Sequence, residues 1–88
     1  MSTAAHVSRV TVYTRENCSL CATAETDVER ICGELGIGWA AVDVDTEPEL
    51  RAEYGDRVPV IMVDDREHGF WRVEEPRLRA ALGDVRKP

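Results

Sequence analysis

The chain has 88 residues, of which 43% are hydrophobic and 32% are charged, and its formal net charge is −6 at pH 7. A chain of this length suits one domain with one core, so we expect residues 1–88 to form a single domain. The acidic balance argues against binding of nucleic acid or of an anionic membrane surface, because both require a basic face.

The sequence begins without a basic segment followed by an apolar run, and it contains no apolar stretch long enough to span a bilayer. We therefore expect a cytoplasmic protein. Three cysteines are an odd number for a secreted domain held together by disulfides. In a cytosolic chain, a Cys-x-x-Cys pair near a strand–helix–strand pattern is instead typical of redox chemistry.

The first half of the chain predicts a strand, a helix and a second strand. Residues 7–14 alternate like a strand, and residues 15–17 form a short polar connection. The following residues are apolar at helical spacing: Ala24, Val28, Ile31, Cys32 and Leu35. This helix should end near Gly36 or Gly38, where glycine can adopt a positive φ. Residues 39–45 return as a strand, which a right-handed crossover makes parallel to the first.

A short helix and a third strand are predicted next. Thr46 and Glu49 stand at capping-box spacing, and Pro48 lies between them in the first turn. This pattern predicts a second helix that ends before Gly55. Residues 58–63 follow, and their richness in β-branched side chains favours a strand.

The last part of the chain predicts a hairpin and a final helix. A polar turn at residues 64–67 leads into a fourth strand at residues 68–73, antiparallel to the third. Because neighbouring residues of a strand point to opposite faces, we expect Phe70 and Trp71 on opposite sides, with one partly exposed. Pro76 then opens a helix. The apolar residues along one side of this helix are Leu78, Ala81, Leu82 and Val85.

Cys18 and Cys21 stand three residues apart, at the junction of the first predicted strand and helix. At a helix start, unpaired backbone N–H groups and the positive end of the helix dipole favour the thiolate of Cys18. Cys21 lies one turn further along the same side and can attack a mixed disulfide that Cys18 forms. We therefore predict an attacking Cys18 and a resolving Cys21.

Two alternatives use the same cysteines differently. In the first, Cys18 and Cys21 of two chains, or a small thiol, complete a metal or iron-sulfur site. A structural zinc needs four ligands, and within one chain only Cys32, His6 and His68 remain, so we predict no metal and no cofactor. In the second, the chain is a partner-binding adaptor whose dithiol is a regulatory lock. Cys32 lies on the apolar helical stripe and is expected to be a buried thiol.

Arg15 and Arg57 are candidate contacts of an anionic substrate group. Arg15 lies shortly before Cys18, where its charge would stabilise a thiolate, although neighbouring Glu16 opposes this effect. Arg57 directly precedes Val58. The alternative for both arginines is a solvated surface charge.

The predicted order β-α-β-α-β-β-α, with a dithiol after the first strand, resembles the thioredoxin fold in its minimal, glutaredoxin-like form over nearly the whole chain. The motif that carries this resemblance is Cys18-Ser19-Leu20-Cys21. The resemblance implies an α/β fold with a four-stranded mixed sheet flanked by helices. It also implies a thiol-disulfide oxidoreductase.

Val58 and Pro59 carry the resemblance as well. A proline within a strand is tolerated at its first residue, and this pair looks like the family's cis-proline, which faces the dithiol. The resemblance therefore implies a cis bond before Pro59. It also implies that the backbone of Val58 pairs with bound substrate like an added strand.

The segment before the last helix departs from glutaredoxins, whose Gly-Gly followed by a polar and an acidic residue is absent. Glu74 and Glu75 stand there and would repel a carboxylate of glutathione, and Pro76 removes an N–H donor. We therefore expect glutathione to be a poor partner. The expected partners are a disulfide-containing protein or low-molecular-weight thiol, and a reductase or small thiol that recycles a monomeric protein.

Overall fold

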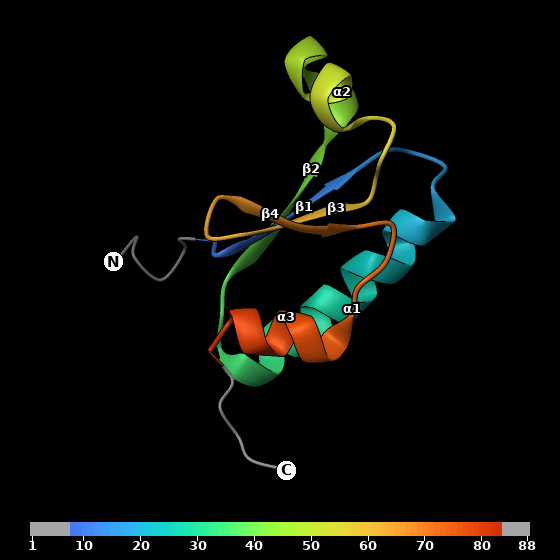
Figure 1. The fold of residues 1–88 in the computed structure, drawn as a ribbon. Coiled ribbons are helices and arrows are strands. Elements are labelled where there is room, and N and C mark those ends of the chain that lie inside the picture. Colours follow the sequence, from blue (N-terminus) through green and yellow to red (C-terminus); the bar gives the residue numbers. More distant parts are fainter. Residues whose placement is uncertain (1–7, 84–88) are drawn as a thin grey trace, which may run out of the picture.

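The computed structural model describes residues 8–83 as a sheet with helices on both sides (Figure 1). In chain order its elements are β1 (Val10–Thr14), α1 (Ser19–Leu35), β2 (Trp39–Asp43), η2 (Val44–Thr46), α2 (Pro48–Tyr54), β3 (Val60–Val63), β4 (Arg66–Phe70) and α3 (Glu75–Ala81). This is the predicted order with one addition, the 3-10 helix η2. None of the helices in the described part of the chain has the length and apolar character needed to cross a membrane.

The strands within residues 8–83 form one mixed sheet in the order β2-β1-β3-β4. Strands β1 and β2 are parallel, with Val10 opposite Trp39. Strand β3 is antiparallel to β1, with Val12 opposite Ile61, and β4 is antiparallel to β3. Helices α1 and α3 lie on one face of the sheet, and α2 lies on the other side near the end of β2 (Figure 1). The predicted fold class is therefore confirmed.

The core lies between the sheet and the helices α1 and α3. Val10 and Val12 point into it because alternate residues of a strand share a face, and Ile61 joins them from β3. The other buried core side chains are Ala24, Val28, Ile31, Cys32, Val63, Leu78 and Leu82. Ala81, expected on the same stripe of α3, is exposed, and Val85 lies outside the described residues.

The predicted capping box before α2 does not form. Thr46 lies in η2, where its hydroxyl donates to the carbonyl of Asp43 at 2.7 Å. The carboxylate of Asp43 accepts from the N–H of Asp45 at 2.8 Å, which ends β2 earlier than predicted. Glu47 is the N-cap residue of α2 without a side-chain cap hydrogen bond, and Pro48 opens the helix. Local bonds between side chains and backbone therefore determine this turn.

The hairpin between β3 and β4 is tighter than predicted. Asp64 and Asp65 adopt φ of 52° and 67°, the positive values that a two-residue type I′ turn requires and that Asp tolerates. Strand β4 therefore begins at Arg66, and Trp71 leaves it with a φ of 74°. The expectation that Phe70 and Trp71 face opposite sides is wrong, because Trp71 no longer follows strand alternation. Both side chains are exposed, and their rings meet edge to face at 5.1 Å.

Ion pairs around Glu75 join helices α1 and α3. Its carboxylate accepts hydrogen bonds from Arg30 at 3.1 and 3.0 Å and from Nε of Arg79 at 2.9 Å. Arg79 also donates to Glu34 of α1. The hydrogen bonds from Arg30 and Arg79 lower the pKa of Glu75 from 4.5 to about 2. Folding therefore favours the charged form of this carboxylate.

We expect Glu75→Gln to change the acid stability of the protein. A carboxylate whose pKa is lowered by folding stabilises the protein above its unfolded pKa, and this contribution disappears as the pH falls from about 4.5 to about 2. The wild type should therefore lose more stability than Glu75→Gln over this interval, while Glu75→Gln is less stable near neutral pH. Urea unfolding at a series of pH values measures the difference.

The control for this experiment is Glu49→Gln, which removes one carboxylate from the exposed first turn of α2. Its unfolding midpoint should follow that of the wild type at every pH. Parallel pH curves for the wild type and Glu75→Gln would contradict the assignment of this ion pair as a source of stability.

Candidate active site

Cys18 is the N-cap residue of α1, with extended φ and ψ of −120° and 102°. Its Sγ accepts a hydrogen bond from the backbone N–H of Cys21 at 3.1 Å. Its carbonyl accepts from the N–H of Ala22 at 3.2 Å. The sulfur thus takes the place that an Asp or Ser oxygen usually occupies at a helix start. A backbone N–H donor and the positive end of a helix dipole are features that favour a thiolate over a thiol.

A disulfide joins Cys18 and Cys21, whose Cα atoms are 5.2 Å apart. Cys21 is only 2% exposed, whereas Cys18 is half-buried. An external thiol or disulfide therefore reaches Cys18 more easily than Cys21. The structure brings together the two cysteines that the sequence singled out. Cys18 is the more accessible of the two to solvent, and Cys21 is the more buried.

A cavity beside Cys18 is lined by residues from three parts of the chain. Arg15 comes from the connection between β1 and α1, Asp45 from η2, and Val58 from the loop before β3. The peptide bond between Val58 and Pro59 is cis, and Pro59 is buried. The structure thus places Arg15 and Val58 on the same cavity as Cys18.

The guanidinium group of Arg15 is paired with Asp45. Its Nε and Nη2 atoms each lie 3.1 Å from a carboxylate oxygen of Asp45, and Arg51 lies 3.8 Å from the same carboxylate. The negative charge of Asp45 reduces the stabilisation that Arg15 gives to a nearby thiolate. Arg15 nevertheless lines the wall of the cavity that contains Cys18.

Arg57 lies on the α2 side of the sheet. Its guanidinium carbon is 5.7 Å from the centre of the Tyr54 ring and 5.9 Å from that of Phe70, and it pairs with Glu67 of β4. Such cation–π and ionic contacts fix a side chain against its neighbours. Arg57 therefore ties the loop that carries Val58 to the sheet, and it does not line the cavity of Cys18.

Glu74 and Glu75, at the start of α3, both lie close to arginine side chains. Glu75 is held by the arginines of α1 and α3, and Glu74 lies 3.8 Å from Arg72 and 3.6 Å from Arg77. The repulsion of a glutathione carboxylate by these two residues is therefore weaker than their sequence positions suggest.

Cys32 lies apart from this site, in the core. Burial raises the pKa of its thiol, so Cys32 stays protonated near neutral pH. Within residues 8–83, no group of at least three His, Cys, Asp or Glu side chains is placed to hold a metal ion. His6, one of the ligands considered for a zinc site, lies outside these residues.

Leu20, which stands between the two cysteines, and Trp71 were not assigned to the site from the sequence. They are 53% and 55% exposed, and both line a second cavity next to that of Cys18. The sequence did contain a signal for Leu20. An apolar residue between the two cysteines that is off the buried stripe of the helix must face solvent.

The Glutaredoxin-like domain (DUF836) family model matches residues 9–83. The uncharacterized protein Rv0508 of Mycobacterium tuberculosis is 42% identical over 79 residues, which are 84% of this chain and 81% of that protein. The solved structure of XcR50 from X. campestris is 32% identical with a TM-score of 0.68, over 88% of this chain and 99% of that chain. Protein Ne2328 of Nitrosomonas europaea is 26% identical with a TM-score of 0.71, over 82% and 87%.

More distant solved structures show the fold alone. A thioredoxin and a glutaredoxin, 24% and 20% identical, superpose with TM-scores of 0.57 and 0.56. The mixed sheet, the flanking helices and the cysteine pair at the start of α1 agree with this likeness. The chain belongs to the glutaredoxin-like domain family and has the thioredoxin fold.

Proposed function

We propose that the protein is a cytoplasmic thiol-disulfide oxidoreductase that acts as a single-domain monomer. Cys18 is the attacking and Cys21 the resolving cysteine. The observation that supports this most directly is the half-buried sulfur at the start of α1, which accepts the N–H of a buried second cysteine. The glutaredoxin-like family assignment supports the same class of chemistry.

In the reductive direction, the Cys18 thiolate attacks one sulfur of a substrate disulfide. A bond forms between Cys18 and that sulfur, the substrate disulfide breaks, and the leaving thiolate takes a proton from water. The Cys21 thiolate then attacks the Cys18 sulfur, which forms the intramolecular disulfide and releases the second substrate thiolate. One electron pair thus passes from protein to substrate, and an external thiol or reductase returns it.

The remaining candidate residues have proposed roles in binding. Val58 pairs its backbone with the substrate chain like an added strand, as supported by its place on the cavity of Cys18. Arg15 meets an anionic group there, while Arg57 positions the loop that carries Val58 and Pro59. The proposed substrates are disulfides of proteins or of low-molecular-weight thiols, with glutathione the poorer choice because it has no large apolar side chain to contact the exposed Leu20 and Trp71.

Differential alkylation tests the two cysteine roles. In the reduced protein at neutral pH, iodoacetamide should modify Cys18 before Cys21 and Cys32, because only Cys18 combines solvent access with a stabilised thiolate. Mass spectrometry of peptides after brief labelling gives the order of reaction. Labelling in urea, where all three thiols react, is the control. Faster modification of Cys21 or Cys32 in the folded protein would reverse the assignment.

A further inference from the structure

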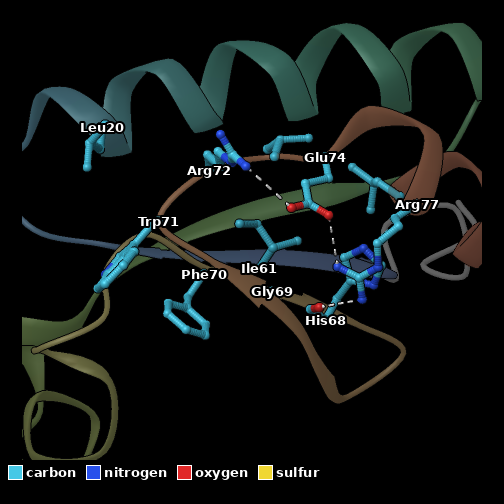
Figure 2. Close-up of a pocket in the computed structure, with 11 residues that line it drawn as sticks. Leu20, Ile61, His68, Gly69, Phe70, Trp71, Arg72, Glu74 and Arg77 are labelled. Carbon is cyan, nitrogen blue, oxygen red and sulfur yellow. Dashed lines mark hydrogen bonds and ion pairs between the residues drawn. The ribbon is translucent and has the colours of Figure 1, made fainter.

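The exposed large apolar side chains within residues 8–83 gather at one place. Leu20, Phe70 and Trp71 are 53%, 43% and 55% exposed. All three line a cavity of about 550 Å³ between the start of α1 and the connection from β4 to α3 (Figure 2). Single exposed apolar residues are ordinary, whereas a cluster around a cavity is typical of a binding site. Ligand pockets usually have volumes of about 300–1,000 Å³.

Leu20 connects this apolar groove with the dithiol. It stands between the two cysteines in the sequence and lines both the groove and the cavity that contains Cys18. Figure 2 shows Leu20, Phe70 and Trp71 toward one end of the groove. A ligand that fills this end therefore lies next to the attacking sulfur.

The wall formed by Phe70 and Trp71 is fixed before any ligand binds. The N–H of Trp71 donates to the carbonyl of Pro59 at 2.7 Å, and the two rings meet edge to face. On its other side, the Phe70 ring lies 5.9 Å from the guanidinium carbon of Arg57. A preformed apolar wall loses little conformational freedom when a ligand binds.

The other end of the groove carries more arginine than carboxylate. Arg72, Arg77 and Glu74 line it (Figure 2). The Arg72 side chain is 79% exposed, with Glu74 at 3.8 Å, and Arg77 also donates to the carbonyl of His68 at 3.1 Å. This end is therefore locally positive on a chain whose net charge is −6, and it suits an acidic group of a ligand.

We propose that the groove binds a polypeptide segment that carries a large apolar side chain and an acidic residue beside the disulfide that Cys18 attacks. The inference rests on the proposed oxidoreductase function and names its substrate class, a protein disulfide. Glutathione has carboxylates but no large apolar side chain, so it leaves the wall of Leu20, Phe70 and Trp71 without a partner. The exchange itself follows the steps given above, with the electrons supplied by the reduced dithiol.

The test compares three substrates of the reduced protein. The first is a disulfide-linked peptide with leucine and glutamate beside its cysteine, the second has serine and glutamine there, and the third is glutathione disulfide. We expect kcat/KM for the first to exceed that for the others by about tenfold or more, the scale of one good apolar anchor.

Substitutions of groove residues then test whether this substrate preference arises from the groove. Trp71→Asn removes the indole, and asparagine tolerates the φ of 74° at this position. It should lower kcat/KM for the apolar peptide by about tenfold and lower that for glutathione disulfide by a much smaller factor. Leu20→Ala should also lower kcat/KM for the apolar peptide, but by a smaller factor. Arg72→Gln should weaken the preference for glutamate, whereas Arg66→Gln, the same change outside the groove, should not.

A peptide with serine in place of cysteine cannot exchange and tests the groove apart from the redox reaction. Calorimetry should show that the wild type binds the apolar form more tightly than Trp71→Asn does. Equal kcat/KM for all three substrates, or equal losses for all three in Trp71→Asn, would overturn the groove and leave the proposed function standing. Binding of the serine peptide without reduction of any disulfide would support the groove and refute the oxidoreductase.

Discussion

Cys18→Ser should reduce disulfide turnover to the rate measured without protein. Serine forms no anionic nucleophile at neutral pH, and the remaining Cys21 is only 2% exposed. Turnover of a protein disulfide with an external thiol as the final reductant measures this loss. Cys32→Ala is the matched control, because Cys32 is buried in the core and lies apart from the site. It should turn over substrate at the wild-type rate at temperatures where it is folded.

Cys21→Ser should separate attack from resolution. Cys18 still forms the mixed disulfide, but without a second thiol the complex is resolved only by external thiol. The complex should accumulate and appear as an added substrate mass in the intact protein under non-reducing conditions. Full turnover by Cys18→Ser, or accumulation of a mixed disulfide on Cys21 in Cys18→Ser, would show that the roles are assigned wrongly.

Leu78→Ala should strongly destabilise the fold. Leu78 is fully buried and is the main attachment of the short helix α3 to the core. Truncation of a buried leucine leaves a cavity and costs about 2–5 kcal/mol. For a domain of this size, the melting temperature should fall by roughly 10 °C or more. Circular dichroism during heating and urea unfolding both measure this loss.

Leu20→Ala makes the same chemical change at a residue that is 53% exposed. The free energy of unfolding should change by no more than about 0.5 kcal/mol, as for most surface substitutions. Equal destabilisation by the two substitutions would contradict the placement of Leu78 in the core and of Leu20 at the surface.

The position of the dithiol could be predicted because local patterns determine it. An apolar strand, a short polar connection and a helical stripe put Cys18 at the start of α1, and the structure has Cys18 as the N-cap residue. The end of this helix is also determined by a local feature of the sequence. Gly36 adopts the positive φ of 69° that only glycine takes without strain, and α1 ends just before it.

The surroundings of the dithiol could not be predicted, because they depend on contacts between distant residues. The sequence places Glu16 next to Arg15, but the structure pairs Arg15 with Asp45 from η2. It likewise places Glu75 beside Glu74, but the fold turns Glu75 toward Arg30 of α1. The sequence shows which charged residues could form ion pairs, but only the packed fold determines which of them lie within reach of one another.

The path of the chain after β4 was not predicted correctly, because it also depends on a contact between distant residues. The sequence pattern predicts a strand over residues 68–73, but the N–H of Trp71 donates to the carbonyl of Pro59 at 2.7 Å and its φ is positive. This contact with a neighbouring segment overrides the local pattern. The exposed pair of rings that results could be found only from the structure.

Helix α2 contributes no buried side chain of its own. The Tyr54 ring stacks on Tyr13 of β1 with centroids 4.5 Å apart. Gly55 follows in a buried position, where any Cβ would meet the carbonyl oxygen of Arg51. Helix α1, in contrast, buries Cys21, Ala24, Val28, Ile31 and Cys32. Segments with few buried contacts open locally at low free energy, so α2 is the easier of the two helices to displace.

The cavity that contains Cys18 therefore has two sides that differ in how firmly they are packed. Ser19 and Leu20 form one side on the firmly packed α1, whereas Asp45 and Gly55 form the other at the two ends of the segment that carries α2. The side on α1 is therefore held by more buried contacts than the side next to α2. In the oxidoreductase proposed above, a small displacement of α2 would therefore admit substrates of different bulk without moving Cys18.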